Sequence, residues 1–426
     1  MSALKASVEA LVALIASSAQ GAVAAYENHE CDAPSLEGHL ETRLSKNRDA
    51  LMRNVRILEG ACAQLCASLM PPATYMSMKA QGAIDVACLN VVLKAKVADI
   101  LDSNTEGLDI AELASLTGLH TTKLLKVMRN LASKHIFTEV FPNVFSQNDL
   151  SRILKEDNPV SLVVGMRVDE DFRYAMCNLH RSMQDPLYSQ SLAPNRSAFS
   201  YGIHDEVPNG TFYDYKFNRA MDGMAEINGH HSIVQEYPWC HLPDGTTICD
   251  VGCGVGIVTQ VLSHTRVAWD QCQSKILTSG RVQFVPLDFF RCSPLRQITH
   301  NWSDEQCLKI LKNIRSVMNP GSRVLIHDII LLSNKIPIKT EGCFSQAPKP
   351  LLPNFGVGSA RLFSQDISMM ALFNAGERTL DEIKTLGSSA GLTFVKFYDL
   401  LDTGLVEFEI ETATKRYGRG EDHEDL

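Results

Sequence analysis

Three glycines at alternate positions, directly after a short β-type run, constrain the fold of this chain more than any other feature. The run covers residues 247–249, and an apolar, helix-like run follows at 257–262. Between them lie an acid and the three glycines, Asp250, Gly252, Gly254 and Gly256. Glycines at this spacing let the backbone turn sharply after a strand and approach a ligand at the N-terminal end of the next helix. The stretch therefore predicts a cofactor-binding strand–loop–helix unit of an α/β fold, although an ordinary tight turn can have the same spacing.

The identity of the cofactor follows from the details of this loop. The pattern overlaps the dinucleotide fingerprint but lacks its last glycine, because Ile257 and Val258 follow Gly256. An acid at the strand end followed by GxGxG resembles the S-adenosylmethionine loop of class I methyltransferases. In that family the loop passes beneath the methionine part of the cofactor. The resemblance implies that S-adenosyl-L-methionine is held by Asp250 and the three glycines.

Composition limits the alternatives. The chain has 426 residues, of which 45% are hydrophobic and 21% charged, as expected for a globular protein of two or three domains. The net charge of -9 argues against nonspecific binding of nucleic acid by the whole chain. Twelve cysteines without a CxxC pair favour free thiols in a reducing cytosol over disulfides or a metal site. We therefore expect a cytoplasmic protein without a metal ion.

The N-terminus is apolar at many positions between 4 and 15, but Lys5 and Glu9 interrupt the pattern. A signal peptide needs positive charge first and an unbroken apolar centre, and this run is shorter than a bilayer-spanning helix. It predicts an amphipathic helix and no membrane partner. The small residues at 17–25 resemble a cleavage site, so secretion stays an alternative.

Residues 108–145 follow the order helix, turn, helix, hairpin. The second helix is expected at 121–133, and two short strands at 136–140 and 144–145 flank a Pro-Asn turn. This order is typical of a winged helix. Positive charge along the second helix would suit a DNA-binding regulator, which is one alternative; it comes from Lys123, Lys126, Arg129 and Lys134.

A winged helix is also similar to the N-terminal dimerisation part of plant and fungal O-methyltransferases. Because the net charge is acidic and a cofactor loop lies downstream, dimerisation is the favoured role. We expect a homodimer that binds no nucleic acid.

The other helical patterns indicate where the domains meet. Helices are predicted at 40–69, where Pro71 and Pro72 end the pattern, at 75–101 and at 161–190. A loop rich in Pro, Ser and Asn follows at 192–208. These features predict a helical, winged-helix-like dimerisation domain at 1–195, a methyltransferase domain at 205–415 and an acidic tail at 416–426.

Three stretches add binding residues through the resemblance. FNRAM at 217–221 resembles the segment that lines the acceptor pocket, which implies Phe217 and Met221, although a Phe and a Met one turn apart are often core residues. Asp270 ends a short strand-like run, where ribose hydroxyls are commonly held. RVQFVPLDFF at 281–290 is similar to the family, and implies that Asp288 and Phe289 contact the adenine.

The chemical centre is expected at HNWSDEQCLKILKNI, residues 300–314. Ser303 with Gln306 suits the start of a helix. The stretch closely resembles the His-Asp/Asn-Trp-Ser-Asp block of caffeate-type O-methyltransferases, whose histidine is the catalytic base. The resemblance implies His300 as the base and Trp302 as a residue of the acceptor pocket. An imidazole suits this role because its pKa, near 6.5, lets it accept a proton from a phenol around neutral pH.

Two acids are expected beside this histidine. Asp328 lies in the buried-strand run 323–331, and Glu377 lies in a block that resembles the family's Gly-x-Glu-Arg-Thr. A carboxylate next to an imidazole fixes its tautomer and stabilises the cation formed on proton transfer. Glu377 could instead be an acid favoured at a helix start.

One departure from the family concerns length. Only residues 291–299 separate Phe290 from His300, where the family fits a loop and a central strand, and Pro294 cannot lie inside such a strand. The region around Asp270 is also short. A weakened or inactive homologue that acts as a partner subunit is therefore a second alternative.

Together these features predict an α/β protein, with a Rossmann-like class I methyltransferase sheet and an N-terminal all-helical winged-helix dimerisation domain. The expected reaction is methylation of a phenolic hydroxyl on a small molecule of secondary metabolism, with S-adenosyl-L-methionine as methyl donor.

Overall fold

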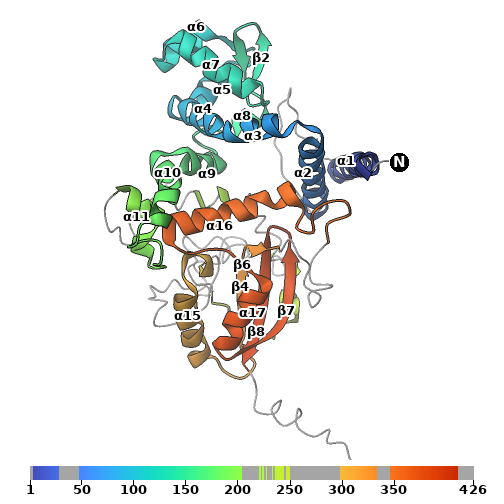
Figure 1. Cartoon of the computed structure of the whole chain (residues 1–426), viewed down its shortest axis with the longest axis vertical. Helices are drawn as coiled ribbons and strands as arrows, with labels where there is room; N and C mark the ends of the chain where they lie inside the picture. The colour runs from blue at the N-terminus through green and yellow to red at the C-terminus, as the bar shows by residue number, and fades with distance from the viewer. Residues whose placement is uncertain are drawn as a thin grey trace, which may run out of the picture. The chain divides into compact units, whose positions relative to one another are not determined.

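The chain forms two compact units, whose elements are labelled in Figure 1. The computed structural model describes residues 3–27, 48–203, 298–332 and 346–410, with residues 220, 221, 223, 224, 227, 233, 236–243 and 246–249. Unit 1 contains Met1–Met183, Phe199–Gly229 and Ala347–Ser359. Unit 2 contains Gln184–Ala198, His230–Gln346 and Ala360–Leu426.

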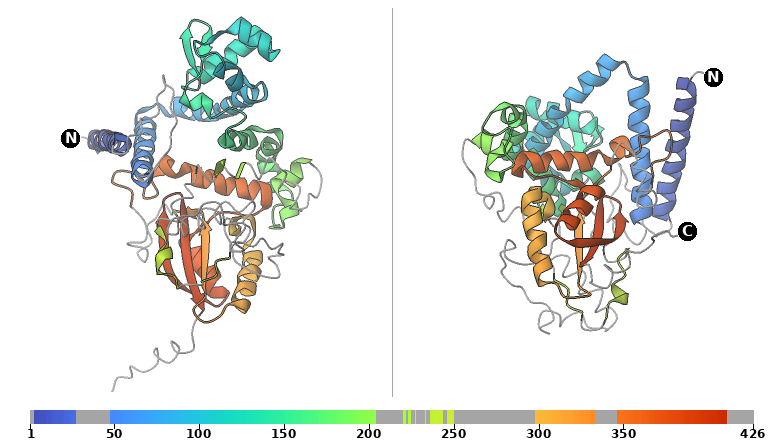
Figure 2. Two further views of the ribbon diagram at one scale, coloured as in Figure 1. Left: turned by 180° about the vertical axis from the view of Figure 1, so that it is seen from behind. Right: turned by 60° about the horizontal axis from the view of Figure 1, so that its bottom comes forward.

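Unit 1 begins with two long helices that pack side by side (Figure 2). They are α1 (Ala3–Glu27) and α2 (Arg48–Leu69). Small residues allow the close packing, because a Cβ at Gly21 would lie 2.5 Å from Oδ1 of Asn54. Helix α1 continues well beyond residue 15, so the expectation of a run too short for a bilayer was wrong: by length and composition alone it could cross a membrane, with a mean hydropathy of 1.6. A core helix or a signal sequence would pass the same test, so this is weak evidence.

The helix predicted at 75–101 is broken twice. Helix α3 ends at Ala80 and α4 begins at Gly82, and a second break follows where Lys96 adopts a left-handed φ of 52°. The pieces are α3 (Pro72–Ala80), α4 (Gly82–Lys94) and α5 (Val97–Asp102). The apolar residues keep a helical spacing across all three helices, so the spacing did not reveal the two breaks.

The winged-helix order predicted for residues 108–145 is confirmed. Gly118, with a φ of 69°, ends the first helix, and Asn143, with a φ of 68°, turns the hairpin. The strands form a three-stranded sheet of order β1-β3-β2. The elements are β1 (Leu108–Asp109), α6 (Ile110–Thr117), α7 (Thr121–Ala132), β2 (Thr138–Phe141) and β3 (Val144–Ser146).

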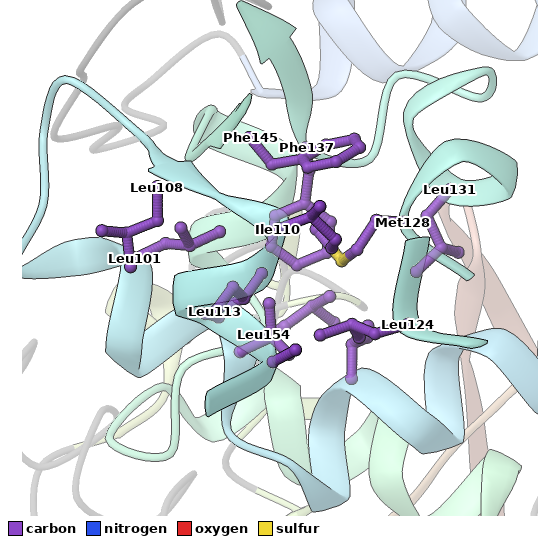
Figure 3. Close-up of a cluster of buried hydrophobic side chains, with 14 of the residues drawn as sticks. Leu101, Leu108, Ile110, Leu113, Leu124, Met128, Leu131, Phe137, Phe145 and Leu154 are labelled. Carbon is purple, nitrogen blue, oxygen red and sulfur yellow. The ribbon is translucent and has the colours of Figure 1, made fainter. Parts of the chain in front are cut away.

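A cluster of apolar side chains forms the core of this winged helix (Figure 3). Leu113, Met128 and Leu131 from the two helices pack with Phe137 and Phe145 from the wing, and each is at most 1% exposed. Burying side chains of this size stabilises the fold by about 1.5–3 kcal/mol each. The wing is therefore an integral part of the core of this domain.

Two of the cations predicted on the second helix, Arg129 in α7 and Lys134 just after its end, have acidic or amide partners within unit 1. Nζ of Lys134 lies 2.6 Å from Oδ1 of Asp85, and Arg129 donates to Oδ1 of Asn143 at 2.9 Å and faces Glu139. These pairs reduce the positive charge that a DNA-reading helix would present.

Four further helices and a short 3₁₀ turn follow the winged helix. The helix predicted at 161–190 is interrupted at Asp169, and the predicted loop at 192–208 contains a 3₁₀ turn and a short helix. The elements are α8 (Asp149–Arg152), α9 (Pro159–Val168), α10 (Glu170–Gln184), η1 (Pro194–Arg196) and α11 (Ala198–Ile203).

Unit 2 is an α/β arrangement whose described strands form two sheets. One has the order β4-β8-β7 with antiparallel pairs, and the other pairs β5 with β6 in parallel. Its elements are η2 (Trp239–His241), η3 (Thr299–Asn301), α15 (Asp304–Val317), β4 (Arg323–Asp328), β5 (Ile330–Leu331), α16 (Ala360–Phe373), β6 (Arg378–Thr379), α17 (Leu380–Ser389), β7 (Leu392–Leu400) and β8 (Thr403–Ile410).

The core of unit 2 lies between the β4-β8-β7 sheet and the two helices α15 and α17. Ile310 and Leu311 of α15 pack with Ile326 of β4 and Phe408 of β8. Gly387 allows α17 to approach, because a Cβ there would lie 2.3 Å from the Phe408 ring. The two closing strands predicted at 392–397 and 405–410 are confirmed as β7 and β8, and each is longer than predicted.

Residues 347–359 lie in unit 1, where they pack against α2. This segment includes η4 (Gly356–Ser359). Nε2 of Gln64 donates to the carbonyl of Pro350 at 2.9 Å, and the Arg56 guanidinium lies 5.2 Å from the centroid of the Phe355 ring. A glycine on each side permits this contact. A Cβ at Gly60 would lie 2.4 Å from the carbonyl oxygen of Phe355, and a Cβ at Gly358 would lie 2.0 Å from the carbonyl oxygen of Arg56.

We therefore expect Gly60→Ala to destabilise unit 1. The new methyl would press on a backbone oxygen, which costs about 1–3 kcal/mol and outweighs the roughly 1 kcal/mol that alanine adds in a helix. Gly165→Ala is the matched control, because it gains the same helix propensity and its Cβ meets nothing within 4 Å. Urea denaturation followed by circular dichroism measures both, and equal shifts in the two variants would contradict the contact.

Candidate active site

His300 lies on the short turn η3, directly before α15. The predicted helix start is confirmed, because Ser303 and Gln306 form a capping box. The neighbouring Thr299 is buried, and its hydroxyl donates a hydrogen bond to Oδ2 of Asp328 at the end of β4. The His300 side chain is 12% exposed.

Glu377 is the hydrogen-bond partner of this histidine. Its Oε1 lies 2.8 Å from Nδ1 of His300, and its side chain is fully buried. The backbone N–H of Glu377 donates to Oδ1 of Asp366 in α16 at 2.8 Å. Gly376 is required next to this bond, because a Cβ there would lie 2.8 Å from the same oxygen. The Glu377 backbone is thus fixed by Asp366 while its side chain faces the imidazole. The N-cap of α17 is Thr379, so Glu377 is not the acid at the start of that helix.

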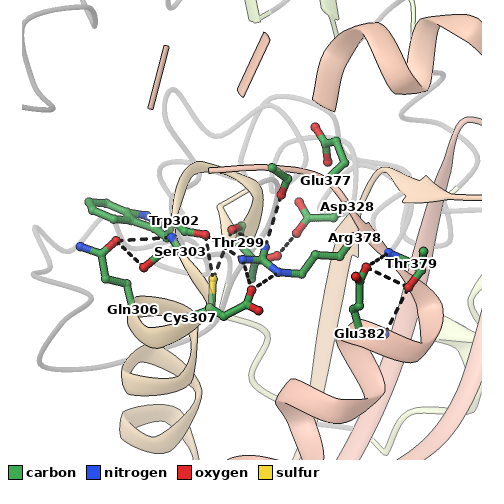
Figure 4. Close-up of polar contacts among 12 residues, drawn as sticks. Thr299, Trp302, Ser303, Gln306, Cys307, Asp328, Glu377, Arg378, Thr379 and Glu382 are labelled. Atoms are coloured by element: carbon green, nitrogen blue, oxygen red, sulfur yellow. Dashed lines mark hydrogen bonds and ion pairs between the residues drawn. The ribbon is translucent and has the colours of Figure 1, made fainter. Parts of the chain in front are cut away.

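The parallel pairing of β5 with β6 brings the two acids together. Ile330 pairs with Arg378. Asp328 lies two residues before Ile330 and Glu377 lies one residue before Arg378, so both acids are close to this pair (Figure 4). Both are buried, with exposures of 2% and 6%. Oδ1 of Asp328 and Oε2 of Glu377 have no hydrogen-bond partner among the described residues.

These carboxylates control the charge of His300. Burial alone would lower the pKa of the imidazole, but Glu377 and Asp328 together raise it further, so that the pKa is about 9. Burial raises the pKa of Asp328 to about 6, and the neighbouring His300 and Thr299 oppose this rise. The two acids thus favour the protonated form of the His300 ring.

The sequence did not single out Arg378 or Asp366. The guanidinium of Arg378, which is 8% exposed, donates from Nε to Oδ1 of Asp304 at 2.9 Å. Its two terminal nitrogens donate to the carbonyls of Thr299 at 2.7 Å and of Trp302 at 2.8 Å (Figure 4). The only signal for Arg378 was its place beside Glu377, and Asp366 carried none.

The remaining predicted site residues are placed as follows. The Trp302 side chain packs against the core of unit 2, and Met221 is a half-buried helical residue of unit 1, so their roles in an acceptor pocket stay predictions. Among the described residues no cluster could hold a metal ion. The other predicted residues lie outside the described part of the chain; they are Phe217, Asp250, Gly252, Gly254, Gly256, Asp270, Asp288 and Phe289.

A curated fungal protein is similar over nearly the whole chain. It is "3-O-methyltransferase 2" of Phanerochaete chrysosporium, 37% identical, with 94% of this chain and 96% of the relative covered. Two solved structures share the fold. The mitomycin 7-O-methyltransferase MmcR has a TM-score of 0.60 at 21% identity, with coverages of 82% and 99%. The calicheamicin methyltransferase CalO1, solved in its S-adenosylhomocysteine-bound form, has a TM-score of 0.56 at 24% identity, with coverages of 80% and 98%.

The alignment with the Phanerochaete protein also measures a shortage of residues. The alignment has 440 positions, but 94% of 426 residues is only about 400. About 40 positions of the relative therefore have no counterpart in this chain.

Family models cover both halves of the protein. The O-methyltransferase dimerisation domain matches residues 79–157, which include the winged helix, and the O-methyltransferase domain matches residues 181–393, which include His300, Asp328 and Glu377. With the similarity to the fungal relative, these matches show that the chain belongs to the O-methyltransferase family.

Proposed function

We propose that this protein transfers a methyl group from S-adenosyl-L-methionine to a phenolic hydroxyl of a small secondary metabolite, with His300 as general base. The observation that carries the proposal is the buried contact of 2.8 Å between Nδ1 of His300 and Glu377, at the N-terminal end of α15. Family membership supplies the class of reaction, and this contact supplies the base.

The hydrogen bond to Glu377 decides which ring nitrogen reacts. Nδ1 carries the proton that it donates to Oε1 of Glu377, so Nε2 of the neutral ring has the free lone pair. When Nε2 accepts a proton, Glu377 and Asp328 stabilise the imidazolium that forms. His300 thus has an orienting partner and charge compensation, as a general base requires.

The charges around His300 suit a cationic methyl donor. With His300 neutral, the acids Asp328 and Glu377 lie beside the reacting ring, while the positive charge of Arg378 is paired with Asp304. The proposed holders of the cofactor are Asp250, Gly252, Gly254, Gly256, Asp270, Asp288 and Phe289. When bound, the sulfonium supplies a methyl carbon that is already activated.

Nε2 of His300 takes the proton of the acceptor hydroxyl while the acceptor oxygen forms its bond to the methyl carbon and the carbon–sulfur bond breaks. The products are a methyl ether, an imidazolium and neutral S-adenosylhomocysteine. Release of the proton from His300 to solvent restores the base.

The pKa of His300 favours a phenol as the acceptor. A phenol has a pKa near 10, and the pKa of His300 lies at about 9. The carboxylates that raise the pKa of His300 make its neutral ring a stronger base, but at neutral pH they also favour the protonated ring, so we expect the base to act best as the pH rises toward 9.

A second candidate function is a partner subunit with little or no turnover. The short interval of residues 291–299 before His300 favours it, since a misplacement of the base by about 1 Å can cost on the order of a hundredfold in rate. Methylation of a panel of phenols, followed by mass spectrometry with the purified protein and cofactor, separates the two candidates. Mass gain of a methyl group supports the enzyme, and its absence over the whole panel supports the partner subunit.

We expect the imidazole of His300 to titrate near pH 9 in the free protein. The folded pKa is raised above the unfolded one, so this group stabilises the fold below about pH 6.5, and the contribution is lost as the pH rises through 9. Glu377→Gln should lower the pKa, whereas Glu382→Gln, at the capping box of α17, should not. NMR titration of labelled histidine measures all three proteins, and an identical pKa in wild type and Glu377→Gln would contradict the charge coupling.

Replacement of the base should reduce turnover strongly. We expect His300→Ala to lower kcat by about 10²–10⁴-fold with little change in cofactor affinity, and Glu377→Gln to cause a smaller loss, because it orients the base. In wild type, kcat/KM should rise with pH up to about 9, since only the neutral ring accepts a proton. Initial rates with the best phenol of the panel measure this. Full activity in His300→Ala would remove the base assignment.

Calorimetric titration with S-adenosylhomocysteine tests the cofactor separately. We expect folded wild type to bind it and Gly254→Leu to bind none, because a side chain would fill the space of close backbone approach. Gly165→Ala serves as a control with an unobstructed Cβ. If folded wild type shows no heat of binding, the cofactor hypothesis fails.

A further inference from the structure

The buried guanidinium of Arg378 forms hydrogen bonds to the turn that carries His300. Arg378 donates to the Thr299 carbonyl at 2.7 Å and to the Trp302 carbonyl at 2.8 Å, and these two carbonyls bracket the histidine in the chain. Nε and Nη2 also reach Oδ1 of Asp304, at 2.9 Å and 2.8 Å. A single side chain thus joins both ends of η3 and the first turn of α15.

The Cys307 thiol of α15 donates weakly to the same two carbonyls, at 3.2 Å to Thr299 and 3.5 Å to Trp302. Within the turn, Asn301 N–H donates to the Ile298 carbonyl at 3.0 Å and Trp302 N–H to the Thr299 carbonyl at 3.2 Å. A 3₁₀ turn of three residues has weaker hydrogen-bond geometry than an α-helix. The planar fork of an arginine can hold two carbonyls at a fixed separation, whereas an ammonium group is a point charge.

Arg378 also follows Glu377 directly in the chain. The same short strand β6 therefore fixes the carboxylate that faces Nδ1 and the guanidinium that holds the backbone on both sides of that ring. Movement of the turn relative to β6 would change the contact between His300 and Glu377. This coupling distinguishes Arg378 from an arginine that only stabilises a helix end.

We propose that Arg378 is a positioning residue, whose guanidinium fixes the turn 299–302 against β6 and so holds the imidazole of His300 at the angle needed for proton transfer. The inference rests on the proposed function of His300 as general base. Arg378 touches neither acceptor nor cofactor in this role, and it acts through the backbone of the turn.

The test compares two arginines that anchor opposite ends of α15. Arg378→Lys keeps the positive charge and removes the fork. Arg315→Lys is the matched control, because Nε of Arg315 donates to the Gly391 carbonyl at 2.9 Å beyond the C-terminal half of the same helix. We expect Arg378→Lys to lower kcat by about 10–100-fold, while the KM for the phenol and the affinity for S-adenosylhomocysteine stay within about threefold. Arg315→Lys should leave kcat within about twofold.

Hydrogen–deuterium exchange of the peptide covering 298–306 gives a readout that does not depend on turnover. We expect faster exchange there in Arg378→Lys and unchanged exchange in Arg315→Lys. If wild type methylates no phenol, the proposed function fails, and the exchange contrast still decides whether Arg378 holds the turn.

Two results would overturn the inference. One is a kcat in Arg378→Lys within threefold of wild type, and the other is an equal loss of kcat in both lysine variants. If Arg378→Lys does not fold, Asp304→Ala replaces it, because Asp304 is 74% exposed at its side chain and its removal frees one edge of the fork. A two- to fivefold fall in kcat with faster exchange at 298–306 then supports the role, and unchanged values refute it.

Discussion

The parallel pairing of β5 with β6 is the constraint on which the site depends. Two residue pairs, Ile330 with Arg378 and Leu331 with Thr379, join segments that lie about fifty residues apart in the chain. This pairing places Asp328 and Glu377 around one imidazole, and it delivers the Arg378 guanidinium to the turn before α15. A two-residue ladder is weak alone, so the buried polar contacts that it aligns must in turn hold it in register.

Local rules predicted the parts of the fold that local residues decide. The capping box at Ser303, the turn at Gly118 and the wing at Asn143 follow from side chains and φ preferences within four residues. The break at Lys96 was not predictable, because a lysine in a left-handed conformation carries no sequence signal. The length of α1 was missed for another reason: its small residues after position 15 read as a cleavage site and not as a helix that packs on α2.

The candidate site was predictable only where a residue belongs to a recognisable block. His300 and Glu377 were found in this way, and their contact joins residues 77 positions apart. Asp366 was missed because its role is to accept one backbone N–H from a distant strand, which any acid or amide on α16 could do.

Residues 347–359 belong to unit 1, so a truncated catalytic fragment would lose the surface that this segment packs against. The O-methyltransferase domain, matched at residues 181–393, includes this segment, yet the segment packs on α2 through Gly60 and Gly358. A catalytic fragment cut at the domain boundary would expose Phe355 and Leu351, which are 4% and 7% exposed in the intact chain. Such a fragment would gain an apolar surface prone to aggregation. Loss of solubility after truncation would therefore report on α2 and not on the integrity of the cofactor fold.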